Sequence, residues 1–251
     1  MVTARRKKSK TTLKARTQSK SSASGRFPNE TPGYRRARER LLTAEIGLRK
    51  QVETVAALRR KLSVGGVVPQ DYVFEGLDTL TGMRSVRLSE LFAPDKDTLV
   101  LYSFMYGPAM AHACPSCTSI IDSLDGATTH VNQRVNLAVV AKSPLPRILS
   151  FARERGWRHV QLLSSAGNSY NRDYHAEDEA GKQWPILNVF VKRNGNIRHF
   201  WASELLFTKA EKGQNQRHVD MIWPLWNLFD VTPEGRGKDW YPKLAYPSQL
   251  G

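Results

Sequence analysis

The spacing of apolar and polar positions changes character near residue 70. Beyond that point, short apolar runs of strand length alternate with segments in which apolar residues recur at helical spacing. The runs at 98–106 and 135–141 are apolar at almost every position, which is typical of strands buried on both faces of a parallel sheet. This part of the chain therefore predicts the order strand, helix, strand, helix, strand, loop, strand, strand, helix.

The segment 185–203 has the pattern of a β-hairpin, because two apolar runs flank Asn194-Gly195, a dipeptide that favours tight turns. Parallel strands joined by helices, followed by an antiparallel hairpin, predict an α/β sandwich with a mixed central sheet. The other expected strands are 71–76, 86–92, 98–106, 135–141 and 159–165, of which 86–92 leads into a short helical turn. The expected helices are 115–132, 144–155 and 218–231, the last interrupted by Pro224.

A heptad pattern precedes this body, between residues 33 and 64, and predicts one long amphipathic accessory helix. The stripe fits two arrangements: packing along the chain's own body, or pairing with a second copy in a homodimer. Gly65-Gly66 marks the end of the helix. The apolar positions seven residues apart are Tyr34, Leu41, Leu48, Val55 and Leu62.

The net charge of +15 is concentrated in front of the body. Residues 1–26 hold nine Lys or Arg and no acid, and 33–63 hold nine basic and three acidic residues, so 64–251 is almost neutral. Residues 1–32 are too polar to bury an apolar core and are expected to be a disordered basic tail. Residues 1–26 could make nonspecific contacts with nucleic acid or an anionic surface, or could be merely solvated.

Several classes of protein are disfavoured by composition. There is no run of about 18 apolar residues for a transmembrane segment, and no apolar region follows the basic N-terminus as in a secretory signal. Two cysteines do not make a disulfide scaffold, so a cytoplasmic location is expected, although the basic front end also has the composition of an organelle transit peptide. Residues 238–251 are expected to be a C-terminal tail on the surface.

The chain's two cysteines lie three apart, in Cys114-Pro115-Ser116-Cys117, where a buried strand gives way to a helix. A thiol at a helix N-terminus faces free N–H groups and the positive end of the helix dipole, which favour the reactive thiolate. Cys114 is therefore expected to attack, and Cys117, one turn later, to resolve a mixed disulfide. The alternatives are a structural pair of reduced thiols and a metal site, but no second Cys-x-x-Cys is present and the six histidines are scattered.

The body resembles the thioredoxin superfamily, and more closely a bacterial family, domain of unknown function 899, whose members are described as predicted dithiol-disulfide oxidoreductases. The resemblance implies a thioredoxin-like domain over 67–237 that exchanges thiols with a protein or small-molecule disulfide and needs no metal or organic cofactor. The matching segments are DYVFEG, LSELF, YSFMYGP, CPSC, SLDGA, LAVVAKSPL, RERGW, SSAGNSYNRDYH, NVFVKRNGNIRHFW and DVTPEGRG.

The resemblance also implies a substrate site. Pro185 stands where a thioredoxin-like fold has a cis-proline facing the two cysteines, and Trp184 precedes it. Tyr106 and His112 are the other expected substrate contacts. A protonated His112 near Cys114 would lower the pKa of the thiol, but an exposed position in the loop is the favoured interpretation of this residue.

The sequence departs from thioredoxin in the residues around the dithiol, where Ala113 replaces Trp and Pro115-Ser116 replaces Gly-Pro. The peroxiredoxin pattern Pro-x-x-x-Thr-x-x-Cys fails when it is counted from Pro108, so a thiol peroxidase is a lesser alternative. The second alternative is a non-catalytic binding protein that acts through the basic tail and the long helix. The loop 166–183 could line the substrate groove or be held by its own hydrogen bonds; its candidate residues are Tyr170, Asp173, Tyr174 and His175.

Overall fold

The computed structural model describes residues 25–78, 82–215, 217 and 220–246. The chain divides into two compact units, Met1–Leu58 and Arg59–Gly251, and each is described by itself. Most of the predicted tail, residues 1–24, lies outside the described residues. Among the described residues, no helix is long and apolar enough to cross a membrane.

Helix α1 spans Pro32–Arg60, close to the predicted helix, and none of its residues is buried. Its first turn is capped by Thr31, whose hydroxyl accepts the backbone N–H of Tyr34 at 3.2 Å. The heptad positions Leu41 and Leu48 are 56% and 64% exposed. Both arrangements predicted for this stripe remain predictions.

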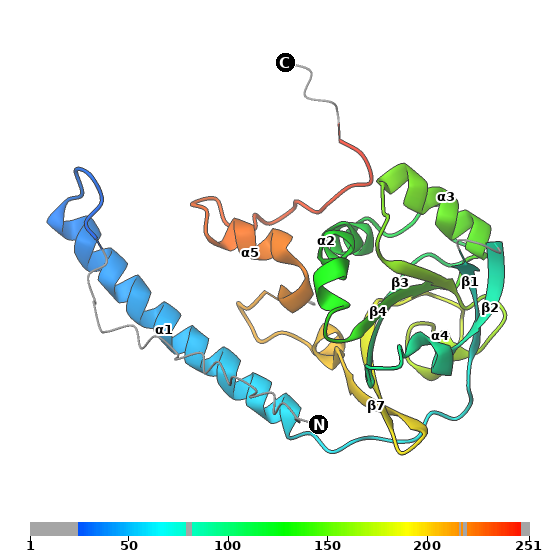
Figure 1. Ribbon diagram of the computed structural model, residues 1–251. Coiled ribbons are helices and arrows are strands. Elements are labelled where there is room, and N and C mark those ends of the chain that lie inside the picture. Colours follow the sequence, from blue (N-terminus) through cyan, green and yellow to red (C-terminus); the bar gives the residue numbers. More distant parts are fainter. Residues whose placement is uncertain (1–24, 79–81, 216, 218–219, 247–251) are drawn as a thin grey trace, which may run out of the picture. The chain divides into compact units, whose positions relative to one another are not determined.

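In the second unit, seven strands of the described chain form one mixed sheet in the order β2-β1-β5-β4-β3-β6-β7 (Figure 1). Strands β3, β4 and β5 are parallel, whereas β6 and β7 run antiparallel at one edge and β1 and β2 at the other. The strands are β1 Val73–Asp78, β2 Gly82–Arg87, β3 Thr98–Phe104, β4 Asn136–Ala141, β5 Gln161–Ser164, β6 Ile186–Arg193 and β7 Asn196–Ala202.

Helix α2 (Pro115–Val131) joins β3 to β4, and helix α3 (Leu145–Arg155) joins β4 to β5. Long crossovers of this kind are what parallel neighbours require. The turn between β6 and β7 is Asn194-Gly195, with φ of 51° and 77°, the left-handed pair that a type I′ hairpin uses. The predicted thioredoxin-like sandwich with a mixed sheet is confirmed.

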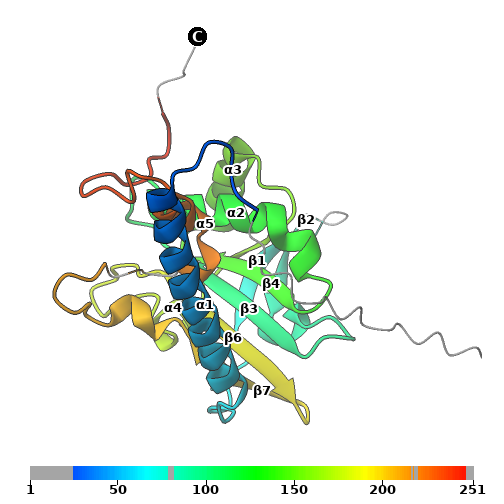
Figure 2. The same ribbon diagram turned by 90° about the vertical axis from the view of Figure 1, so that its left-hand side faces the viewer.

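The sheet carries a buried cluster on each face, because successive side chains of a strand point to opposite sides. On β3, Tyr102 and Phe104 face a cluster that also contains residues of α2 and α3, while Leu99 and Leu101 face the other. Figures 1 and 2 show α2 and α3 together on one side of the strands. We call the first side the dithiol face, because Cys117 is part of it, and the second the closed face.

The remaining helical pieces are short. The predicted helix at 218–231 appears as a 3₁₀ turn, η3 (Asp220–Ile222), followed by helix α5 (Pro224–Asp230). The break follows from Pro224, which has no N–H to donate and is tolerated in a first turn. The others are η1 Leu88–Leu91, α4 Tyr170–Asp173 and η2 Glu204–Phe207.

Candidate functional site

Cys114 is the N-cap residue of α2, with an extended backbone (φ −65°, ψ 121°) and Pro115 in the first turn. Its backbone N–H donates to the carbonyl of Met105 at 3.0 Å, and its carbonyl accepts the N–H of Thr118 at 2.9 Å. These bonds hold the residue on both sides at the point where β3 leads into the helix. Its sulfur therefore lies beside the free N–H groups of the first turn.

The surroundings of Cys114 favour its thiolate. The pKa of this thiol falls from 9.0 to about 6, mainly because the thiol of Cys117 donates a hydrogen bond to it; partial burial opposes the shift, and the backbone N–H groups of Cys117 and Ser116 add to it. At neutral pH most of the Cys114 thiol is consequently ionised and nucleophilic.

Cys117 has the opposite character. It is 1% exposed, and burial together with the neighbouring Cys114 holds its pKa well above the ordinary value. Both cysteines are free thiols in the structure. One turn of helix thus brings together an accessible thiolate and a buried, protonated thiol.

Tyr102 lies on the same side of β3 and is completely buried. Its hydroxyl makes no hydrogen bond of ordinary geometry with any described residue. The phenol and the Cys117 thiol nevertheless shift each other's pKa. Burial, and after it Cys117, raises the pKa of Tyr102, whereas Tyr102 lowers the pKa of Cys117 and so offsets part of the increase that burial causes there. The sequence analysis did not predict a buried hydroxyl without a hydrogen-bond partner of ordinary geometry beside the buried Cys117 thiol.

A pocket of about 380 Å³ opens beside the two cysteines. Trp184 and Pro185, which immediately precede β6, line it together with both cysteines, and their role in substrate binding stays a prediction. The further walls come from distant segments and were missed, since no local pattern marks them. The lining residues are Tyr102, Met105, Cys114, Ser116, Cys117, Ile120, Trp184, Pro185, Leu206, Phe207, Trp223 and Tyr241.

The expectation of a cis peptide bond at Pro185 is wrong, because no described residue forms one. The backbone N–H of Trp184 donates to the carbonyl of Ala176 at 2.8 Å, and the chain passes from this bond into β6 in the trans form, which costs less than the cis form. Pro185 still faces the dithiol through the pocket.

Tyr106 and His112 do not line the pocket. His112 is exposed in the loop before Cys114. Tyr106 is buried, and the guanidinium of Arg147 lies 4.2 Å from the centre of its ring. Arg147 also donates to the carbonyls of Gly107 and Met110, so Tyr106 and Arg147 together support the loop that carries the cysteines.

The polar loop 166–183 is held largely by its own hydrogen bonds. Asn171 is buried, accepts the hydroxyl of Ser165 at 2.6 Å and donates to Gln183 at 3.1 Å. Within the loop, the hydroxyl of Ser169 donates to Asp173 at 2.6 Å, and the backbone N–H of Lys182 donates to Asp178 at 2.9 Å. None of the four residues named for a substrate groove lines the pocket, which favours the self-bonded alternative.

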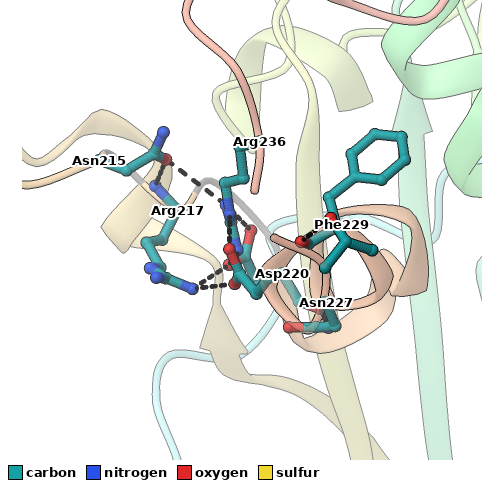
Figure 3. Close-up of polar contacts among 8 residues, drawn as sticks. Asn215, Arg217, Asp220, Asn227, Phe229 and Arg236 are labelled. Atoms are coloured by element: carbon teal, nitrogen blue, oxygen red, sulfur yellow. Dashed lines mark hydrogen bonds and ion pairs between the residues drawn. The ribbon is translucent and has the colours of Figure 1, made fainter. Parts of the chain in front are cut away.

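A cluster of charges joins η3, the end of α5 and the segment that follows it. Arg236 reaches Asp220 at 2.7 Å and Asp230 at 2.6 Å, and Arg217 reaches Asp230 at 2.7 Å (Figure 3). The hydrogen bond from Arg236 is the main reason that the pKa of Asp230 falls to about 2. Trp223, between η3 and α5, donates its indole N–H to Ser119 of α2 at 3.1 Å, which ties this segment to the dithiol helix.

Within the described ranges, no three His, Cys, Asp or Glu side chains come together as a metal site would require. The prediction that the protein uses neither a metal nor an organic cofactor stays a prediction.

Three solved structures illustrate what the chain resembles in fold. Plasmodium yoelii thioredoxin peroxidase I is 20% identical, with a TM-score of 0.42 over 65% of this chain and 88% of that one. Enterococcus faecalis AhpC is 11% identical, with a TM-score of 0.43 over 71% and 98%. The peroxidoxin BcpB of Mycobacterium tuberculosis is 19% identical, with a TM-score of 0.40 over 64% and 94%.

No functionally curated protein matches the chain. A family model does match, over residues 25–247, which include the long helix, the whole sheet and both cysteines. The chain therefore belongs to the family described as bacterial protein of unknown function, DUF899.

Proposed function

We propose that the protein is a thiol-disulfide oxidoreductase in which Cys114 attacks and Cys117 resolves. The observation that carries this proposal is the asymmetry of the pair: Cys114 is partly accessible at the start of a helix and receives a hydrogen bond from the buried thiol of Cys117. An attacking thiol works best with a pKa near the ambient pH, and a resolving thiol has to stay protected until the mixed disulfide has formed.

The exchange balances as two steps. The Cys114 thiolate attacks a substrate disulfide R–S–S–R′, forms a bond to the RS sulfur, and releases R′S⁻, which takes up a proton from water. Cys117 then loses its proton and attacks the sulfur of Cys114, forming the Cys114–Cys117 disulfide and releasing RS⁻, which is protonated in turn. The substrate gains two electrons, which the two cysteines lose. Of the two protons that it gains, one balances the proton released by Cys117 and the other comes from water, because Cys114 starts as the thiolate. A dithiol reductant reverses the sequence.

The reducing role of the pair is tested by equilibrating the full chain in graded thiol/disulfide buffers, alkylating it and measuring the fractions by mass spectrometry. A reversible two-electron transition between the dithiol and an internal disulfide supports the proposal. Cys117→Ser should accumulate a mixed disulfide on Cys114, whereas Cys114→Ser should form none. If no internal disulfide forms in any buffer, the proposal fails.

The thiol-peroxidase alternative predicts a different product. The Cys114 thiolate would attack hydrogen peroxide or an alkyl hydroperoxide, become a sulfenic acid and release hydroxide or an alkoxide, which water then protonates. The pocket contains no Arg, Lys or His side chain to stabilise a departing oxygen anion. Peroxide consumption that is fast and needs Cys114, together with slow disulfide exchange, would favour the alternative.

The proposal places the protein in the cytoplasm, where free thiols persist. We also propose a homodimer through α1, because the heptad residues Leu41 and Leu48 are exposed. Light scattering on the full chain should give twice the monomer mass. Leu48→Glu should reduce this mass to that of the monomer, whereas Thr43→Glu, which adds the same charge outside the heptad stripe, should not.

Residues 1–26 are proposed to bind nucleic acid without sequence preference, and this binding should weaken steeply as the salt concentration rises.

A further inference from the structure

The pocket beside Cys114 is apolar to an unusual degree for a site that handles a charged nucleophile. None of its lining residues is Asp, Glu, Lys, Arg or His. Its volume of about 380 Å³ falls in the range of small-molecule sites, about 300–1,000 Å³. The one charge that it contains at neutral pH is the Cys114 thiolate itself, which repels anions.

The aromatic walls present hydrocarbon to the pocket, because two of their polar groups already have partners. The indole N–H of Trp184 donates to Asp178 at 3.2 Å, and that of Trp223 donates to Ser119 at 3.1 Å. Phe207 packs against Trp184 with ring centres 6.1 Å apart and is 48% exposed. An anionic substrate group would lose hydration here and gain no positive charge from the lining residues, which is costly.

The backbone around the dithiol offers little to an extended polypeptide. The N–H of Trp184 is engaged by Ala176, the N–H of Cys114 is engaged by Met105, and Pro185 has none. A peptide that pairs as an extra strand needs such donors. Recognition at this site therefore depends on filling the pocket with an apolar group rather than on main-chain pairing.

We propose that the preferred substrate is a small, uncharged organic disulfide that carries an aromatic or aliphatic group, with that group in the pocket and one sulfur at Cys114. This inference rests on the proposed function and adds its substrate class. The chemistry is the two-step exchange given above: the apolar disulfide is reduced to two thiols and the Cys114–Cys117 pair becomes a disulfide.

The test compares two forms of one aromatic disulfide, bis(4-carboxyphenyl) disulfide and its dimethyl ester, which differ mainly in charge. The rate of Cys114 oxidation in the full chain is divided by the rate for a small reference thiol, which removes the intrinsic reactivity of each disulfide. This ratio should be at least about tenfold larger for the ester. A cystine peptide with apolar neighbours serves as a third substrate.

Two variants on one short helix sharpen the test. Phe207→Lys places a cation in the pocket wall and should reduce or reverse the preference for the ester. Leu205→Lys is the matched control, because Leu205 is also exposed, at 55%, but does not line the pocket; the preference should be unchanged.

The outcomes separate the two proposals. Fast oxidation by both disulfides with equal ratios, or equal effects of the two lysine variants, would overturn the substrate class and leave the oxidoreductase standing. A cystine peptide that reacts faster than the ester would assign the pocket to polypeptides instead. Failure of every disulfide to oxidise the pair would overturn the proposed function, and the substrate class with it.

Discussion

The two faces of the sheet are both densely packed, yet their contents differ. On the closed face, Tyr72, Phe74, Tyr170 and Phe190 form a fully buried group of rings at edge-to-face or tilted angles. On the dithiol face, the cluster contains Cys117 and extends to a pocket open at one side. The comparison teaches that the same alternation along β3 contributes to a sealed core on one side and to the surroundings of the two thiols and their pocket on the other.

The largest effect that separates the faces is expected from Phe190→Ala on the closed face. Phe190 is completely buried, so the variant should lose about 3–5 kcal/mol of unfolding free energy. Because Phe190 does not line the pocket, the Cys114 pKa measured by alkylation should remain near 6 in the folded variant. Denaturant titration measures the first quantity, and Phe190→Leu should lose less than about 1.5 kcal/mol. A shifted Cys114 pKa would mean that the faces are coupled.

Ionisation of Cys114 should tie the stability of the dithiol face to pH. The pKa of this acid is lower in the folded chain, about 6, than in the unfolded chain, about 8.5, so its contribution is fully present above pH 8.5 and is lost as pH falls through 6. The reduced protein should therefore gain up to about 3 kcal/mol over Cys114→Ser between these pH values. Unfolding measured at several pH values in both proteins checks this, and parallel pH profiles would contradict it.

Asp125 of α2 connects this helix to the segment just before β5. Asp125→Ala should lower the free energy of unfolding by about 2 kcal/mol. Its carboxylate accepts backbone N–H groups of Arg158, His159 and Val160 at 2.8–3.1 Å, and although burial raises its pKa, these bonds lower it on balance.

A lowered carboxyl pKa contributes stability above the unfolded value of about 3.9 that is lost at more acidic pH. The difference in unfolding free energy between the native chain and Asp125→Ala should accordingly shrink below pH 4. A difference that stays constant down to pH 2 would show that the carboxylate charge has no part in it.

The smallest effect is expected from Tyr102→Phe. Removing a buried hydroxyl that lacks an ordinary partner should change stability by less than about 1 kcal/mol. Burial and Cys114 raise the pKa of Cys117, and the hydroxyl of Tyr102 partly offsets this increase. The variant should therefore raise the pKa of Cys117 further and slow the resolving step. Stopped-flow measurement of mixed-disulfide decay checks this, with Tyr170→Phe on the closed face as the control that should not slow it.

The sequence determined the elements and the reactive pair. Apolar runs at 98–106 and 135–141 predicted the central strands, and Asn194-Gly195 predicted the hairpin turn. The position of Cys114 at a strand-to-helix junction predicted the direction of its pKa shift, whereas the largest cause of that shift is the hydrogen bond from Cys117. These features depend on residues close together in the chain, so local spacing and helix geometry are sufficient to predict them.

Only the tertiary structure decided what surrounds the pair. Leu206, Phe207, Trp223 and Tyr241 reach the pocket from segments about 90 to 130 residues beyond Cys114, and Trp184 arrives with its N–H already bonded to Ala176. Tyr106, by contrast, is buried in the core, and the peptide bond before Pro185 is trans. Contacts between distant segments depend on how the sheet brings its edges and covering helices together, and a one-dimensional pattern of apolar and polar positions carries no record of that geometry.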